Sequence, residues 1–395
     1  MLRPSCIFVV ILILFSCAFG ARKLDGNAPP TNFQVLYNFT DYSDGCCIAA
    51  GVARDRGGNL YGVAYLSQNE ASFGDLFKLT PTAQGYKFQI LKSFDSSNGG
   101  CMGTPTIDAS GNVFGVCWGT GIEDGTLWEY SRGKFSLLHA FNGPTDGMEP
   151  TDSVALDNAG NLYGTAYTWG PGQGGTLWKY SLSSGSFTVL HSFTDGADGA
   201  LLMAGPRIDA HGKIWGTTAT GPNCYYCGSG TVWNYDLTSG TFSTVLDFGT
   251  SGILDPMSRL AFDAAGNVYG TAFGTTQGNC GLVYELEKSN NYAPVIVYAF
   301  TGSNDGCEPF GSVTLDSTGN IFGTAYSGGA SGAGTVYQLT PANGAWQETT
   351  LHSFTVSDGD RPQSGLTTDG QGNWFGTTAA GGSGTWGTVF EISVK

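Results

Sequence analysis

Short runs of hydrophobic and β-branched residues recur along almost the whole chain, separated by turns rich in Gly, Asn and Asp. Each run spans four to eight residues, a length and composition typical of a β-strand. No segment places apolar residues at i, i+3, i+4 and i+7 over three turns, so the pattern predicts no helix. We therefore expect an all-β protein.

The runs are organised by an internal repeat. A five-residue motif, GNLYG or a close variant, occurs seven times with first glycines 49 to 54 residues apart, and an Asp stands three residues before each. Those aspartates are Asp55, Asp108, Asp157, Asp209, Asp263, Asp316 and Asp369. Asp accepts hydrogen bonds from the backbone two residues on, and Gly supplies the positive φ of a bulged hairpin. We interpret the motif as a turn rather than a catalytic feature.

Each unit carries four strand-like runs, here named A to D from the innermost to the outermost. In the sixth unit they are Ser312 to Asp316, Asn320 to Tyr326, Gly334 to Leu339 and Gln347 to Phe354. Four antiparallel strands repeated seven times predict a seven-bladed β-propeller over residues 33–395. The chain starts with an unaccompanied D strand, Phe33 to Phe39, and ends on A, B and C strands. We expect the N-terminal outer strand to join the C-terminal blade and close the ring.

The repeat units resemble the GloVer tandem repeats of exported bacterial proteins. The resemblance rests on units such as the run from Asp316 through the following Gly-Asn-Ile-Phe-Gly, then Gly334-Thr-Val-Tyr-Gln-Leu and Leu351-His-Ser-Phe. It covers about residues 33–395 and implies a propeller-like fold outside the cytoplasm. It implies no particular chemistry, since the family carries none that could be transferred.

The N-terminus reads as an export signal, residues 1–20, followed by a linker at 21–32. Arg3 precedes an apolar run from Cys6 to Phe15, and small residues end at Gly20. The run is too short for the ~20 apolar residues of a spanning helix. An alternative interpretation makes Cys17 the acylated cysteine of a lipoprotein. We expect a secreted or cell-surface protein, lipid-anchored through Cys17 in the alternative.

Composition narrows the partners. Gly is 62 of 395 residues, against ~7% in average proteins, which fits frequent tight turns. The formal net charge is −15, which opposes binding to nucleic acid or to an anionic membrane surface. We expect a monomer that binds no nucleic acid and has no membrane span.

The connections from strand B to strand C differ most between units, and they emerge on the same face as the D to A connections. Variation on a constant scaffold marks the face that is free to acquire function. Rigid aromatics in or beside these loops are candidates to stack on sugar rings, although rim aromatics also pack on neighbouring loops. These candidates are Trp118, Trp169, Tyr225, Tyr226 and Trp386.

The D to A connections repeat an Asp-Gly pair. If their carboxylates converged near the channel mouth, a hard cation such as Ca²⁺ would relieve the negative potential. The alternative is that the pair is again a turn signature, and no other cofactor is expected. The weak metal candidates are Asp44, Asp146, Asp198, Asp305 and Asp358.

An enzyme would need its acid, base or nucleophile on this face, and no histidine is expected there. His139, His191 and His352 fall in D strands, and His211 falls in an A to B turn. Their positions argue against His-dependent hydrolases and Ser-His systems. Paired carboxylates ~5–10 Å apart would still support glycoside hydrolysis. The candidate pairs are Asp305 with Glu308 and Asp146 with Glu149.

The cysteines suggest disulfides on the loop-bearing face. We expect Cys224 with Cys227, Cys280 with Cys307, and Cys101 with Cys117, because strands A and B of the second unit place position 117 opposite residues near 102. The CxxC spacing of Cys224 and Cys227 also fits redox or zinc sites, but no second CxxC accompanies it. Cys46 and Cys47 are left to pair vicinally or to stay as thiols.

Two functions remain open. The first is an exported binding module that recognises a polysaccharide or another surface ligand through the loop-bearing face. The second is a carbohydrate-active enzyme, of the glycoside hydrolase kind, that uses paired carboxylates there. One observation distinguishes these two functions: whether two carboxylates line a closed pocket with an aromatic wall.

Overall fold

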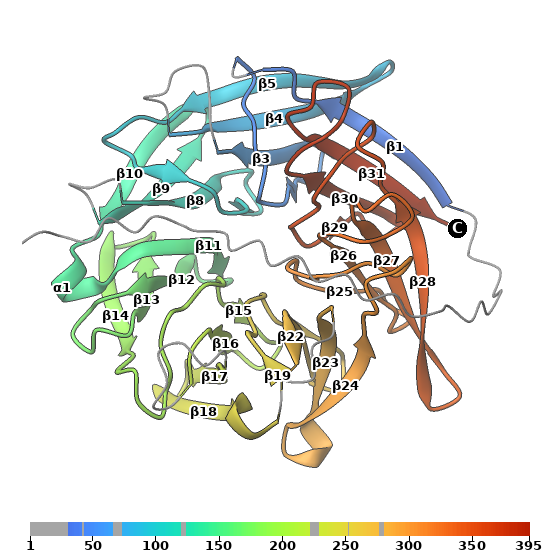
Figure 1. Cartoon of the computed structure of the whole chain (residues 1–395). Coiled ribbons are helices and arrows are strands. Elements are labelled where there is room, and N and C mark those ends of the chain that lie inside the picture. Colours follow the sequence, from blue (N-terminus) through green and yellow to red (C-terminus); the bar gives the residue numbers. More distant parts are fainter. Residues whose placement is uncertain are drawn as a thin grey trace, which may run out of the picture.

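The fold was taken from a computed structural model that describes residues 31–41, 43–65, 73–119, 124–221, 229–251, 253–275 and 280–395. The predicted signal, Cys17 and all of the linker before Thr31 lie outside the described residues. Seven antiparallel sheets stand side by side around a central axis (Figure 1). The protein is a seven-bladed β-propeller, as its sequence predicted.

Each of the first six blades has four main strands in chain order from the axis outward. Blade 1 contains β2 (Ala53–Arg54), β3 (Leu60–Ala64), β4 (Asp75–Thr82) and β5 (Gly85–Ser93). Blade 2 contains β7 (Thr106–Ile107), β8 (Val113–Trp118), β9 (Gly125–Ser131) and β10 (Lys134–Ala140), and the short strand β6 (Gly100–Cys101) also pairs with β8. Blade 3 contains β11 (Met148–Leu156), β12 (Asn161–Thr168), β13 (Thr176–Ser181) and β14 (Ser186–Ser192).

The remaining blades follow the same plan. Blade 4 contains β15 (Arg207–Ile208), β16 (Lys213–Thr218), β17 (Thr231–Asp236) and β18 (Thr241–Asp247). Blade 5 contains β20 (Ala261–Phe262), β21 (Val268–Ala272), β23 (Leu282–Glu287) and β24 (Ala293–Ala299), and β19 (Ile253–Leu254) and β22 (Gly274–Thr275) form a separate pair in its connections. Blade 6 contains β25 (Thr314–Leu315), β26 (Ile321–Ala325), β27 (Thr335–Ala342) and β28 (Ala345–Ser353).

The seventh blade joins the two ends of the chain. It is formed by β29 (Thr367–Thr368), β30 (Asn373–Thr378), β31 (Thr388–Val394) and the N-terminal β1 (Thr31–Asn38). Strand β1 pairs antiparallel with β31, from Thr31 opposite Val394 to Asn38 opposite Thr388, and the two lie side by side in Figure 1. The N-terminal strand therefore supplies the outer edge of the last blade.

Two details differ from the sequence expectations. The innermost strands are mostly two residues long rather than four to eight, and β11 is the long exception. Short helical turns are also present among the described residues, although no helix was expected. They are α1 (Gly143–Asp146), η1 (Phe248–Thr250) and η2 (Lys288–Asn290), all in connections between strands.

The repeated motif holds both the hairpin and the blade core. In blade 3, Asp157 accepts backbone hydrogen bonds from Ala159 and Asn161 and a side-chain bond from Asn161, all at 2.8–2.9 Å. The motif's second glycine, Gly164, lies under the indole of Trp178, and a Cβ there would come within 2.1 Å of the ring. Because the equivalent glycines meet aromatic rings in the other blades, the motif is structural.

A second repeated contact runs around the outer rim. In blade 2, Asp146 accepts from the His139 ring at 2.7 Å, and that ring stacks on Phe187 of blade 3 with centroids 3.8 Å apart. We call such an Asp, its ring on the outer strand and the stacked residue of the next blade a rim latch. Equivalent latches join Tyr37 to Asp44 and Phe88, His191 to Asp198 and Phe242, and His352 to Asp358 and Phe33.

Candidate ligand-binding cavity

The B to C and D to A connections share one face of the ring. Their backbones pair directly in three blades, between Ala200 and Thr220, Cys307 and Ser327, and Asp360 and Ala380. The face that was predicted to carry the variable loops is therefore assembled from both sets of connections.

A cavity of about 290 Å³ lies on the axis, and the segments leading into the innermost strands of all seven blades line it. One side chain from each blade forms a ring of varied chemistry, six residues before the motif Asp. That ring comprises Ala49, Met102, Thr151, Met203, Met257, Phe310 and Gln363. Trp118 and Tyr167, at or next to the ends of strands β8 and β12, add aromatic surface. The cavity thus combines apolar, aromatic and hydrogen-bonding walls, as ligand sites do.

Four charged side chains line this cavity, and three of them come from the inner segments of successive blades. Asp152 lies on β11, Arg207 begins β15, and Arg259 precedes β20. The Arg259 Nε atom is 3.7 Å from Asp152 Oδ2, which also accepts a hydrogen bond from the Gly205 backbone at 3.2 Å. Glu149 is the fourth charged residue.

The cavity shifts the acidity of these groups. The pKa of Arg207 is lowered to about 10, mainly by burial. The positive charge of Arg259 also lowers this pKa, and the Asp152 carboxylate raises it by a smaller amount. Burial also lowers the pKa of Arg259, again against the effect of Asp152. Burial, together with the Asp124 carboxylate, raises the pKa of Glu149. For Arg259 and Glu149 the shift reflects charge held among protein atoms instead of bulk water, whereas Arg207 as a residue is exposed to solvent.

Sequence reasoning missed Asp152, Arg207 and Arg259, although the repeat carries a signal for them. Counting back from the motif Asp, the other six units have only Ala, Gly or Ser at the Asp152 position. They have only Gly, Ser or Thr at the Arg259 position, and only Ala or Thr at the Arg207 position. Aligning the seven copies and searching for charged exceptions would have found all three.

The predicted aromatic residues are not brought together. Trp118 lines the cavity, whereas Trp169 does not line it and is 51% exposed on its loop. Trp386 packs against a core cluster that includes Phe39 and Val389. Tyr225 and Tyr226 lie outside the described residues.

The predicted metal candidates occupy separate turns. Four of the five Asp-Gly carboxylates act in the rim latches, and Asp305 accepts from Tyr298 at 3.0 Å and from the Thr301 backbone. None of the five lines the cavity, because each turn is anchored to its own outer strand. Within the described ranges, no three or more His, Cys, Asp or Glu residues are grouped to hold a metal ion. Calcium binding stays a prediction.

The predicted carboxylate pairs also diverge. Glu149 faces the cavity while Asp146 belongs to a rim latch. Glu308, whose Oε2 atom is 3.3 Å from Ser327 Oγ, does not line the cavity, and neither does Asp305. The carboxylate that accompanies Glu149 in the cavity wall is Asp152, which the sequence analysis did not select.

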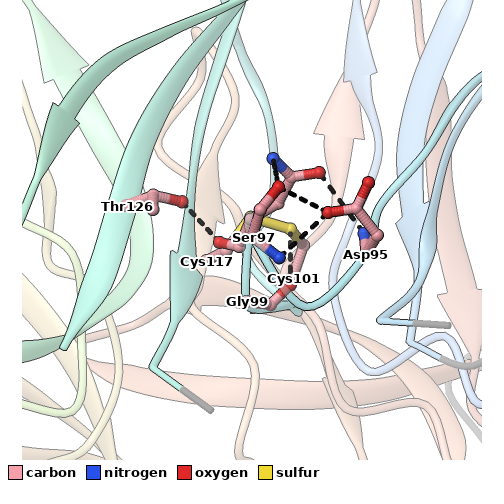
Figure 2. Close-up of a disulfide and its surroundings, with 7 residues drawn as sticks. Asp95, Ser97, Gly99, Cys101, Cys117 and Thr126 are labelled. Atoms are coloured by element: carbon pink, nitrogen blue, oxygen red, sulfur yellow. Dashed lines mark hydrogen bonds between the residues drawn. A yellow bond between two sulfur atoms is a disulfide. The ribbon is translucent and has the colours of Figure 1, made fainter. Parts of the chain in front are cut away.

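Two of the three predicted disulfides are confirmed. Cys101 is paired with Cys117 across the β6–β8 register, and Figure 2 shows this bond beside Asp95, Ser97 and Thr126. Cys280 is paired with Cys307 and links the fifth B to C connection to the next D to A connection. Cys224 and Cys227 lie outside the described residues. The sulfurs of Cys46 and Cys47 are 3.0 Å apart, so the choice between a vicinal disulfide and thiols stays open.

The sequence profile of the Gloeobacter/Verrucomicrobia repeat matches residues 117–279 and 226–395. These two matches together span more than half of the chain. The protein belongs to the Gloeobacter/Verrucomicrobia repeat family. The resemblance inferred from the repeat units is therefore confirmed. A comparison with curated proteins found no significant match.

Solved structures similar to this member of the Gloeobacter/Verrucomicrobia repeat family share its fold at low sequence identity. An oligogalacturonate lyase from Vibrio parahaemolyticus is 12% identical, with 93% of this chain and 99% of that one covered and a TM-score of 0.57. An oligogalacturonate lyase in complex with manganese is 10% identical, with 93% and 94% covered and a TM-score of 0.59. PorZ, a surface component of the type-IX secretion system of Porphyromonas gingivalis, is 15% identical, with 87% and 46% covered and a TM-score of 0.53.

Two further observations bear on where this family member acts. Its disulfides are compatible with an extracellular protein, since such bonds persist in oxidising compartments. In the part of the chain that the structure describes, no helix has the length and apolar character needed to cross a membrane.

Proposed function

We propose that this protein is an exported binding module that recognises a polysaccharide or another surface ligand at its central cavity. The observation that carries the proposal is the cavity itself, to which the seven blades contribute five different types of side chain at one repeat position. A scaffold that repeats one structural motif seven times has no need to vary these positions, whereas a binding site does. We further propose that it acts as a secreted or cell-surface monomer.

The residues around the cavity suit a saccharide. Trp118 and Tyr167 offer flat rings on which a sugar can stack, and Thr104, Thr151 and Gln363 offer hydrogen-bonding groups for hydroxyls. Oligogalacturonate lyase and PorZ show that this fold serves both enzymes and surface components, so the fold alone does not choose between catalysis and binding.

The experiment is a glycan-array screen of the full chain, followed by titration of the best glycan. We expect Trp118→Ala to weaken binding about tenfold or more, because truncating an aromatic residue that anchors a ligand costs about 2 kcal/mol or more. The matched control is Trp169→Ala, because Trp169 lies in the B to C connection of blade 3 and does not line the cavity. Binding that depends on Trp169 and not on Trp118 would contradict a site in the cavity. The screen is run with and without EDTA, which tests the predicted Ca²⁺.

A carbohydrate-active enzyme is the second candidate, and Glu149 is the observation that favours it. Its burial raises its pKa, as is typical of a carboxyl that serves as a general acid, and Asp152 lines the same cavity. If the bound glycan is cleaved by the wild-type protein and not by Glu149→Gln, the enzyme would replace the binding module.

A further inference from the structure

We infer that Arg207 and Arg259 form an anion-binding subsite in the wall of the central cavity and that it takes a carboxylate carried by a sugar. The inference deepens the proposed function and rests on it, since it names the chemical class of the ligand. It predicts that acidic saccharides bind and that neutral ones bind poorly.

The two guanidinium groups have more hydrogen-bonding capacity than the surrounding protein uses. The Arg207 side chain lines the cavity and makes no hydrogen bond or ion pair with any described residue, while its backbone pairs with Trp215. Arg259 has a buried Nε atom without a hydrogen-bond partner, and its ion-pair contact is Asp152 at 3.7 Å. A guanidinium carries five N–H donors, so most of the donors of this pair are available to a ligand.

The charge balance around the two arginines also favours an anion. Two arginines face one nearby carboxylate, Asp152, which leaves one positive charge uncompensated. Glu149 lines the same cavity, but it makes no ion pair with either arginine in the described structure. Burial of Arg259 among the lining residues lowers its pKa, so its charge is held at a cost. A bound anion would lower that cost, because opposite charge favours the charged form.

The fold does not require these arginines. The other six blades close the channel with Ala or Thr at the Arg207 position and with Gly, Ser or Thr at the Arg259 position. Asp152 departs from the repeat in its backbone as well, with a φ of 52° that no equivalent residue shares. Strained backbone of this kind concentrates at functional sites. The departures fall in blades 3, 4 and 5, so they form one continuous part of the wall.

A carboxylate fits this arrangement better than a phosphate. The cluster of Arg207, Arg259 and Asp152 has a net charge of +1, which one carboxylate neutralises, whereas a phosphate dianion would leave one negative charge in excess beside Asp152 and Glu149. A planar guanidinium binds a planar carboxylate through two parallel hydrogen bonds. Trp118 and Tyr167 in the same wall provide the rings against which the rest of a sugar would lie.

The test is calorimetric titration of the full chain with sodium glucuronate, glucose and inorganic phosphate. We expect glucuronate to bind at least about tenfold more tightly than glucose, because hydrogen bonds to a charged group contribute ~1.5–3 kcal/mol. Arg207→Gln and Arg259→Gln should each weaken glucuronate binding by at least about tenfold. Arg56→Gln, which removes the same charge from an exposed A to B turn, should leave binding unchanged. Melting curves of each variant establish that it is folded, and Arg207→Lys keeps the charge should the Gln variant not fold.

The outcomes separate this inference from the proposed function. Equal affinity for glucose and glucuronate, or glucuronate binding that survives both arginine substitutions, would overturn the anion subsite. Phosphate that binds more tightly than glucuronate would overturn the carboxylate. Arginine-dependent glucuronate binding in a protein that captures no glycan on the array would uphold the subsite and defeat the proposed function alone.

Discussion

The outer rim and the channel wall are built from the same seven repeats, yet they differ in how strictly the repeat is kept. On the rim, four Asp-Gly turns hold a ring of their own outer strand against an aromatic residue of the next blade. In the channel wall, three successive blades replace small residues by Asp152, Arg207 and Arg259. The rim residues that hold neighbouring blades together are repeated from unit to unit. The channel-wall positions depart from the repeat, which indicates that they are less constrained by packing between blades.

The physical reason lies in what each region contacts. A rim latch joins two blades, so both partners must change together if either changes. A channel-wall side chain faces the cavity on one side, and the contacts between blades that Asp152 and Arg259 make are one ion pair at 3.7 Å and one hydrogen bond from Gly205. Variation is therefore tolerated on the axis at a lower cost in stability than at the rim.

The rim carries the largest effect we expect. Deleting residues 31–38 removes β1 and leaves β31 as an unpaired edge in the last blade. The deletion should lower the Tm by on the order of 10 °C or more, measured by circular dichroism. The control chain begins at Ala21 and keeps β1. A deletion variant that melts with this control would show that the seventh blade does not need its N-terminal strand.

A single rim latch should have a smaller effect on stability and none on binding. Asp146→Ala leaves the His139 ring and the Asn142 backbone N–H without their carboxylate acceptor. Loss of these buried contacts should cost about 1–3 kcal/mol of unfolding free energy. Asp41→Ala is the control, because Asp41 is an exposed aspartate of the same kind of connection. Equal losses in urea unfolding would show that the latch contributes nothing specific.

The smallest effect that we expect comes from Glu348, a residue that departs from the repeat on the rim. This effect depends on pH. Glu348 stands where most other outer strands carry Phe, and it faces Tyr298 of blade 5. Burial raises the pKa of Glu348 to about 7, and Asp305 adds to this against the hydrogen bond from Thr350. A raised carboxyl pKa means that its contribution to stability is full below pH ~4.5 and is lost as the pH rises to about 7.

Glu348→Gln should therefore raise the Tm at pH 8 by on the order of 1–2 °C and leave it unchanged at pH 4.5. Glu287→Gln, at the end of β23, is the control. The pH dependence would be refuted by an equal Tm difference between Glu348→Gln and wild type at both pH values.

Features that repeat were predictable from the sequence. The seven motif copies gave the blade number, and the unaccompanied run at Phe33 to Phe39 gave the pairing of β1 with β31. The disulfide between Cys101 and Cys117 followed from antiparallel register across one hairpin. Each of these inferences needs only local strand geometry, which the pattern of residues expresses directly.

Features that depend on the third dimension were not predictable in the same way. Asp-Gly turns were considered as metal ligands because their carboxylates were expected at the channel mouth, but the outer strands hold them. The sequence pattern predicted innermost strands of four to eight residues, whereas most of them pair over only two positions near the axis. Arg207 and Arg259 were not predicted because they lie at the short inner strands, whereas variation between the repeats is greatest in the loops.

The central claim is that departures from the repeat in the channel wall serve binding and not folding. The most direct measurement restores the repeat by combining Asp152→Ser, Arg207→Ala and Arg259→Ser, which are residues that other blades carry at these positions. We expect the triple variant to keep its Tm within about 2 °C of wild type, because the contacts between blades that it removes are only one ion pair at 3.7 Å and one hydrogen bond. We also expect it to lose glucuronate binding. A variant that binds glucuronate as wild type does, or that unfolds far below it, would contradict the claim.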